Sequence, residues 1–114
     1  MARDSLALGD FEELVLLAIQ NLGVEAYGVP IRERLEERAG RRVTVGALYT
    51  TLGRLDGKGF ISSHKEAGTP EMGGRSRMLF KVEALGQDAL DAAERVRRNL
   101  RGGDWAPVRP LARR

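Results

Sequence analysis

Residues 41–60 read RRVTVGALYTTLGRLDGKGF, and this segment holds the helix from which the rest of the fold can be predicted. Thr44 is a typical helix N-cap, so we expect a helix from there to about Gly57. One face collects large apolar residues at spacings of three, four and three: Val45, Leu48, Leu52 and Leu55. The opposite face carries small residues, a hydroxyl and one long cation: Gly46, Ala47, Thr50, Gly53 and Arg54. Two internal glycines weaken an isolated helix by about 1 kcal/mol each, which favours a face that something approaches closely.

Two further helices are predicted before this stretch. Asp10 is expected to N-cap the first, which runs to about Asn21, with Glu13 completing a capping-box-like pattern. Its apolar residues cover most of the helix circumference: Phe11, Leu14, Val15, Leu16, Leu17, Ala18 and Ile19. Because a surface helix needs only one apolar stripe, we expect this helix to bury one side in its own core and another against a second chain.

The second helix is predicted to open at Tyr27-Gly28-Val29-Pro30, since proline is tolerated in a first turn. Ile31, Leu35 and Ala39 are spaced by four and form its predicted core stripe. Gly40 is the expected C-cap, because helices commonly end on a left-handed glycine.

Two strands are predicted after the quoted stretch, from Phe60 to about Glu66 and from Arg77 to Val82. The segment between them is rich in turn residues and longer than a tight hairpin needs. Its end, Gly73-Gly74-Arg75-Ser76-Arg77, is expected to be flexible and cationic. His64 lies within the first strand, where a structural or exposed role is expected.

The last helix is predicted from Ala84 to about Arg101. Its apolar residues recur at spacings of four, three, four and four: Leu85, Ala89, Ala92, Val96 and Leu100. This spacing is typical of a seam against another helix, as in a short coiled coil. We expect residues 84–101 to form a C-terminal dimerisation helix, followed by a mobile basic tail over residues 102–114 that contains Trp105.

The composition limits the classes of function. The chain has 114 residues, no cysteine and one histidine, so a single domain is expected, with no metal site, no cofactor and no catalytic residues. No apolar run approaches the roughly 20 residues that cross a bilayer, and no signal peptide is seen, so a cytoplasmic protein without membrane contact is predicted. Formal charge is −4 over residues 1–40, +5 over 41–81 and +2 over 82–114. A basic middle favours an anionic partner such as nucleic acid, although an unevenly charged solvated surface is the alternative.

The order of helix, helix, helix, two-stranded hairpin and helix predicts a mainly α protein with a small β-hairpin wing. This is the winged helix-turn-helix arrangement, here over residues 1–83. In it the third helix enters the DNA major groove and the hairpin lies along the backbone or in the minor groove. A winged-helix module that binds proteins without DNA is the alternative, and a basic wing with a small-residue helix face speaks against it.

Three segments together resemble the PadR family of bacterial transcriptional regulators. They are LGDFEELVLLAI, AYGVPIRERLEERAGRRVTVGALYTTLGRLDGKGFI and GGRSRMLFKVEALGQDAL, within residues 8–95. The resemblance implies a homodimeric winged-helix DNA binder, usually a repressor, that dimerises through its last helix packing on its first. Some short members hold planar ligands at that interface beside an aromatic residue of the last helix. Residues 84–101 contain none, so a small-molecule effector there is an open question.

Candidate site residues follow from these patterns. The predicted contacts to double-stranded DNA are Thr44, Gly46, Ala47, Tyr49, Thr50, Arg54, Arg75 and Arg77. For Tyr49 the alternatives are a hydroxyl that reaches phosphate, as the resemblance implies, and a half-buried core tyrosine. The predicted dimer interface is Phe11, Leu14, Leu17, Leu85, Ala89, Ala92, Val96 and Leu100.

Overall fold

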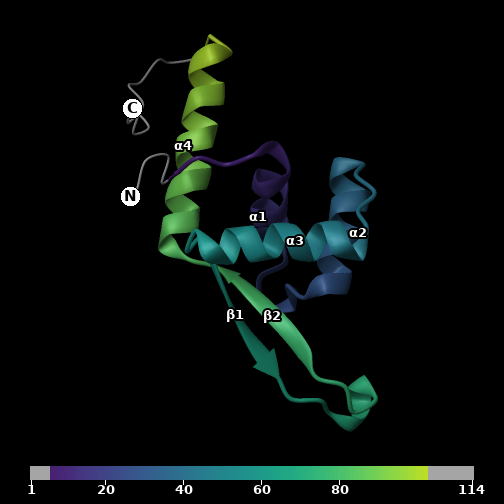
Figure 1. Ribbon diagram of the computed structural model, residues 1–114. Helices are drawn as coiled ribbons and strands as arrows, with labels where there is room; N and C mark the ends of the chain where they lie inside the picture. The colour runs from purple at the N-terminus through teal and green to yellow at the C-terminus, as the bar shows by residue number, and fades with distance from the viewer. Residues whose placement is uncertain (1–5, 103–114) are drawn as a thin grey trace.

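The computed structural model describes residues 6–102, apart from the side chain of Met72. Its helices are α1 (Asp10–Leu22), α2 (Gly28–Ala39), α3 (Val45–Gly57) and α4 (Ala84–Leu100). Two strands, β1 (Ile61–Glu66) and β2 (Arg77–Val82), form one antiparallel hairpin between α3 and α4. Short 3-10 turns occupy Gly23–Glu25 and Pro70–Met72. Figure 1 shows α3 lying across the front of α1 and α2, with the hairpin reaching away below them. The predicted fold class is confirmed.

The start of α1 differs from the prediction by one residue. Gly9, not Asp10, is the N-cap, and Glu12, not Glu13, closes the turn: its carboxylate accepts the Gly9 N–H at 2.8 Å. The Glu12 carboxylate also accepts a hydrogen bond from the Lys58 ammonium, with Nζ 2.8 Å from Oε1. Both contacts are made to Oε1, so one carboxylate oxygen ties the start of the helix to Lys58. A cap without a side chain left no signal of its own in the sequence.

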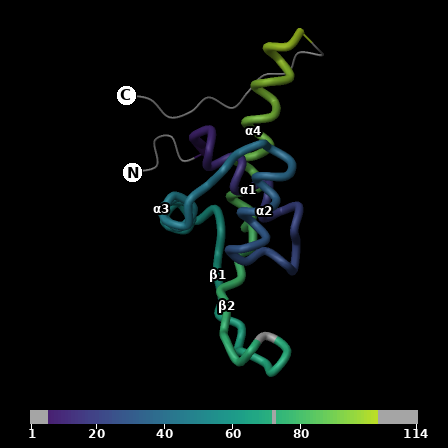
Figure 2. The backbone as a smooth tube through the Cα atoms, turned by 90° about the vertical axis from the view of Figure 1, so that its right-hand side faces the viewer, coloured from purple at the N-terminus to yellow at the C-terminus, as the bar shows by residue number. Residues whose placement is uncertain are grey.

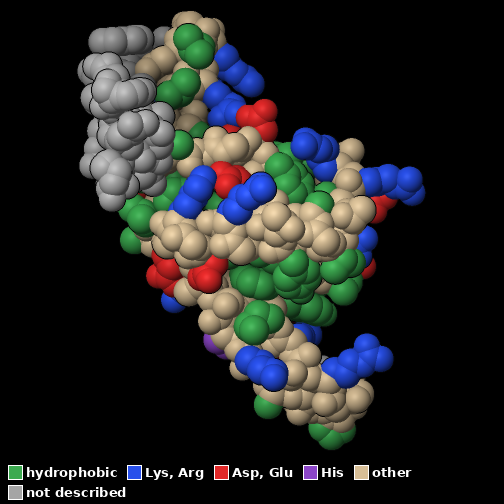
Figure 3. All heavy atoms as spheres, in the orientation of Figure 1, with side chains coloured by type: hydrophobic (Ala, Val, Ile, Leu, Met, Phe, Trp, Pro, Cys, Tyr) green, Lys and Arg blue, Asp and Glu red, His purple; other side chains and the backbone are tan. Residues whose placement is uncertain are grey.

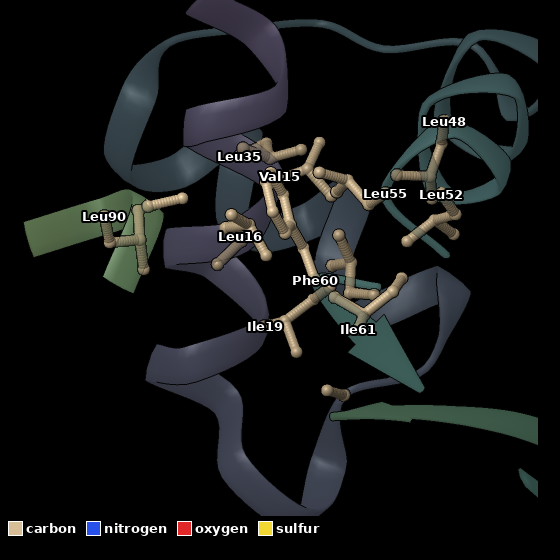
Figure 4. Close-up of a cluster of buried hydrophobic side chains, with 14 residues drawn as sticks. Val15, Leu16, Ile19, Leu35, Leu48, Leu52, Leu55, Phe60, Ile61 and Leu90 are labelled. Carbon is tan, nitrogen blue, oxygen red and sulfur yellow. The ribbon is translucent and has the colours of Figure 1, made fainter. Parts of the chain in front are cut away.

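A single apolar core joins all the helices and the base of the hairpin. Figure 4 shows side chains from α1, α2, α3, β1 and α4 meeting in it, among them Val15, Leu16, Ile19, Leu35, Leu48, Leu52, Leu55, Phe60, Ile61 and Leu90. The α3 stripe is buried as predicted at Leu48, Leu52 and Leu55, whereas Val45 is 53% exposed. The α2 stripe is buried at Ile31 and Leu35, but Ala39 is exposed in the last turn, so that part of the prediction is wrong. Ala39 instead lines an open hollow between α1 and α2.

The hairpin, which we call the wing, is joined to the segment before α2 by one backbone hydrogen bond and is closed at its base by another. The Phe80 N–H donates to the Ala26 carbonyl at 2.8 Å, and the Glu83 N–H donates to the Phe60 carbonyl at 2.9 Å. The strand register pairs Ile61 with Val82 at the base and Glu66 with Arg77 at the far end. The tip of the wing, between the two strands, is a hydrogen-bonded turn: the Gly73 and Gly74 N–H groups donate to the carbonyls of Pro70 and Thr69.

Helix α4 begins inside the core and leaves it. Gly86, Ala89 and Leu90 are buried, and the second half of the helix projects beyond the body (Figure 1). A view turned by 90° shows α3 standing clear of α1, α2 and α4 on one side of the molecule (Figure 2). Within residues 6–102, every helix is too short or too polar to cross a membrane. The predicted tail, including Trp105, lies outside the described residues from position 103 onward.

Candidate nucleic-acid interface

The outer face of α3 is exposed and has little bulk. Gly46, Ala47, Thr50, Gly53 and Arg54 are all exposed there. A Cβ added at Gly46 or Gly53 would meet nothing within 4 Å, so neither glycine is required by packing inside the chain. In the space-filling view a band of small and polar groups crosses the molecule at this level (Figure 3). Another molecule can therefore approach the backbone of α3 closely along this face.

Thr44 and Tyr49 frame this face at its start. The Thr44 hydroxyl accepts the Ala47 N–H at 3.0 Å, which confirms Thr44 as the N-cap of α3. Tyr49 is 46% exposed, and its ring meets the edge of Phe80 on β2, with centroids 6.4 Å apart. Its hydroxyl lies over Gly28 at the head of α2, where a Cβ would come within 2.6 Å of it. Tyr49 thus packs along one side against the wing and α2 and leaves the other side open.

Basic side chains lie near the α3 face, before the helix and on the wing. Arg41 and Arg42 precede α3 and are exposed; the Arg41 guanidinium lies 5.6 Å from the ring centroid of Phe11, and Arg42 is 3.9 Å from the Glu36 carboxylate. Figure 3 shows Lys and Arg side chains along the upper edge of the band and again on the wing. The α3 face therefore has basic side chains on two of its sides, and such a placement attracts a polyanion.

Glu12 and Lys58 brace the end of α3 against the start of α1. Burial alone would raise the pKa of the Glu12 carboxyl, but the hydrogen bonds from Lys58 and the Gly9 N–H, with the positive charges of Lys58 and Arg54, hold that pKa below its ordinary value. Lys58 also donates to the Ala7 carbonyl at 3.1 Å. Because Lys58 is engaged in these contacts, Arg54 is the exposed cation on this part of α3.

The two wing arginines are in different situations. Arg75 is exposed at the tip and has no ion-pair partner among residues 6–102. Arg77 is paired with Glu66, Nε to Oε1 at 2.7 Å, and its guanidinium lies 4.3 Å from the ring centroid of Tyr27. The hydrogen bond to Glu66 raises the pKa of Arg77 above its ordinary value. Only one of the two predicted wing contacts is thus free for an external anion.

The residues predicted at a dimer interface divide into two groups. Most leave apolar surface uncovered in the single chain: Leu17 is 43% exposed, Leu85 41%, Val96 40% and Leu100 83%, while Phe11, Leu14 and Ala92 are half-buried. Ala89 is 1% exposed and packs into its own core together with Leu90. Arg97 links α4 to α1 through Glu13 at 2.9 Å. The exposed apolar residues of α4 are therefore Leu85 in the first turn and Val96 and Leu100 in the half that projects from the body.

The sequence pattern missed two groups that the structure brings together. Lys58 and Glu12 are 46 positions apart, and Arg77 meets a tyrosine 50 positions away. The spacing of neighbouring residues in the sequence does not predict contacts between residues so far apart. Glu66 and Arg77 face each other as a cross-strand pair, so an exact hairpin register would have predicted their contact.

Three helices with an exposed third helix and a flanking hairpin define the winged helix-turn-helix class. Residues 15–92 match the model of the PadR-like family of transcriptional regulators, and this protein belongs to that family. The family is one of transcriptional regulators, not of enzymes. The predicted resemblance is confirmed.

Known relatives agree with this assignment. The chain is 32% identical over 83 residues to the transcriptional regulator Rv3488 of Mycobacterium tuberculosis, a match that covers 69% of this chain and 73% of that one. A PadR-like transcription factor from Bacteroides fragilis is similar in structure, with a TM-score of 0.65, 27% identity and coverage of 80% of this chain and 82% of that one. A PadR family regulator from Clostridium difficile, 21% identical, shares the fold with a TM-score of 0.65 over 80% of this chain and 91% of that one.

Proposed function

We propose that this protein is a homodimeric transcriptional repressor that binds an inverted-repeat DNA operator. The observation that carries the proposal is the outer face of α3, which is exposed, almost free of bulky side chains and has cations along its upper edge and on the neighbouring wing. The major groove of B-DNA is about 12 Å wide and admits one helix. A face built from Gly46, Ala47, Thr50 and Gly53 lets that helix lie close to the base edges.

Within this proposal, the predicted DNA-binding residues have two roles, which are reading base edges and contacting phosphates. Arg54 and Thr50 lie on a rigid helix and are suited to reading base edges. Arg75 lies on the wing tip and is suited to following phosphates. Thr44, Gly46, Ala47 and Tyr49 line the approach to the groove.

The dimer in this proposal forms through α1 and α4. The exposed apolar side chains of Leu17, Val96 and Leu100 supply surface that the single core leaves uncovered. A two-fold dimer presents two copies of α3, which fit half-sites about one helical turn apart. Such a dimer covers promoter DNA, which is the physical basis for repression, and DNA binding places the protein in the cytoplasm with the chromosome.

The proposal is tested by DNA titrations at several salt concentrations. Footprinting of the DNA upstream of the gene supplies the operator, and a scrambled duplex supplies the comparison. Arg75→Ala should weaken binding to both duplexes equally and lower the slope of log affinity against log salt by about one per subunit. Arg54→Ala should cost about 1–3 kcal/mol on the operator and reduce its preference over the scrambled duplex.

Arg101→Ala is the matched control, because it removes one positive charge at the far end of α4 (Figure 1). It should leave both affinities unchanged. If the Arg54 and Arg75 variants bind both duplexes as the parent does, with the same salt slope, then α3 and the wing do not bind DNA. That result would favour a protein-interaction module.

A further inference from the structure

The contact between the wing and the head of α2 has no role in the proposed DNA interface. Arg77, at the tip end of β2, lies with its guanidinium 4.3 Å from the ring centroid of Tyr27. Its Nε donates to Glu66 at 2.7 Å, across the last pair of the β ladder. A planar guanidinium that is stacked and paired is held in one orientation, unlike a single exposed ion pair. We call Arg77, Tyr27 and Glu66 the wing clamp.

The wing clamp acts at a distance from the backbone attachment of the wing. The Phe80 N–H to Ala26 carbonyl bond fastens β2 two residues from Val82 at the base, and Arg77 lies three residues further toward the tip. Three residues of extended strand span about 10 Å. A hairpin fastened at one point can swing about that point, and a second contact about 10 Å along removes most of that freedom.

The same segment of α2 also contacts α3. Tyr27 is the N-cap of α2, and the next residue, Gly28, lies under the Tyr49 hydroxyl of α3. Tyr49 in turn meets Phe80 of β2. The head of α2 is therefore the common support of the wing and of α3, and a wing fixed to it is fixed relative to α3.

We propose that Arg77 is a positioning residue that holds the wing at a set angle to α3 and does not itself bind DNA. This inference rests on the proposed function, because the angle matters only if Arg75 at the tip and α3 must reach the same duplex. Two observations separate Arg77 from a phosphate contact. Its guanidinium is engaged by Tyr27 and Glu66, whereas Arg75 has no ion-pair partner among residues 6–102. Release of Arg77 to DNA would also leave the Glu66 carboxylate unpaired beside phosphates, where like charges repel.

A pair of substitutions at Tyr27 tests the wing clamp without changing any charge. Tyr27→Leu keeps apolar bulk but removes the aromatic face, and it should weaken operator binding about fivefold, as expected for loss of one cation–π contact. Tyr27→Phe keeps the ring and should bind within about twofold of the parent. If the Leu variant binds as the parent does, or if the Phe variant loses as much as the Leu variant, the wing clamp is not what positions the wing.

A double-mutant cycle separates positioning from direct contact. Arg77→Ala should weaken operator binding about fivefold in the parent, but by less than about twofold when Arg75 is already alanine, because Arg77 acts through Arg75. Two independent DNA contacts would instead give effects that add. Additive losses, or a loss from Arg77→Ala that is equal in both backgrounds, would overturn the proposal.

Nuclear magnetic resonance of the full chain supplies a signature that general destabilisation does not produce. The Arg77 side-chain Nε–H proton should resonate upfield because of the Tyr27 ring, should keep that shift in Tyr27→Phe and lose it in Tyr27→Leu. It should also stay in place when operator DNA is added, while the Arg75 signal moves. An Arg77 signal that moves with DNA would identify a DNA contact and overturn the positioning role.

If the parent binds no duplex at all, the proposed function fails together with this inference, whereas additive effects with a DNA-binding parent overturn this inference alone.

Discussion

At the scale of single residues, buried charge decides how the elements meet. Glu12 is 8% exposed, yet its carboxylate is satisfied by Lys58 and by the Gly9 N–H. It lies at the first turn of α1, where the helix dipole favours a negative charge. One side chain thus caps α1 and also holds the end of α3 against it.

Glu12→Gln should lower the free energy of unfolding by about 1–2 kcal/mol at neutral pH, because a charged hydrogen bond to Lys58 is lost. The pKa of Glu12 is lower in the folded chain than its ordinary value of 4.5. Its stabilising effect is therefore complete above that value and is lost as pH falls through the lower folded pKa. Denaturant unfolding should show the gap between parent and variant closing as pH falls below about 4. Glu33→Gln, on the exposed side of α2, is the control and should show no comparable gap at any pH.

The sequence predicted single residues well where the signal was local. Thr44 was expected to cap α3, and its hydroxyl does so. Asp10 was expected to cap α1, but the cap is Gly9. The Gly9 N–H is bonded by the carboxylate of Glu12, two positions after Asp10. Tyr27, the aromatic partner of Arg77, lies 50 positions away at the N-cap of α2. The sequence alone therefore did not distinguish a free cation on the loop from a residue of the wing clamp.

At the scale of elements, α3 combines poor helix formers with an exposed face. Gly53→Ala should raise the free energy of unfolding by about 1 kcal/mol, because alanine is the better helix former and its Cβ meets nothing within 4 Å. The same methyl group should weaken operator binding by about 1–3 kcal/mol, the usual cost of an extra methyl group in a close-packed contact, if this face lies against base edges. Thermal unfolding and a DNA titration on the same sample check both effects. A variant that is more stable and binds DNA as tightly as the parent would show that α3 does not approach DNA closely at Gly53.

Periodicity predicted the order of the four α-helices and two strands, but not the two 3-10 helices and not every buried face. The α3 stripe at spacings of three and four was assigned to the core, and three of its four residues are buried there. On α4 the apolar residues are alanine, leucine and valine on more than one side, so spacing alone did not separate the core face from the outer seam. Ala89 and Leu90 face the core, and Val96 and Leu100 do not. The point at which α4 leaves the body depends on tertiary packing, which the sequence of the helix alone does not reveal.

At the scale of the whole molecule, the projecting half of α4 carries the exposed apolar side chains of Val96 and Leu100, which the proposed dimer would cover. Val96→Asp should split the proposed dimer, because two buried charges would meet across the seam. Val96 is 40% exposed in the single chain, so the fold itself should survive. Val24→Asp is the matched control: Val24 is 87% exposed in the turn after α1, and its substitution should leave the dimer intact. Sedimentation of both variants checks this, and an unchanged dimer for Val96→Asp would remove α4 from the interface.

The central claim is that two copies of α3 read a two-fold DNA sequence. Its most direct test is selection of bound duplexes from a random-sequence library by the purified protein, followed by sequencing of the bound pool. We predict an enriched inverted repeat whose half-sites lie about one helical turn apart. In a parallel selection, Arg54→Ala should lose preference at one position in each half-site. A bound pool with no enriched sequence, or with a single unrepeated site, would contradict the account.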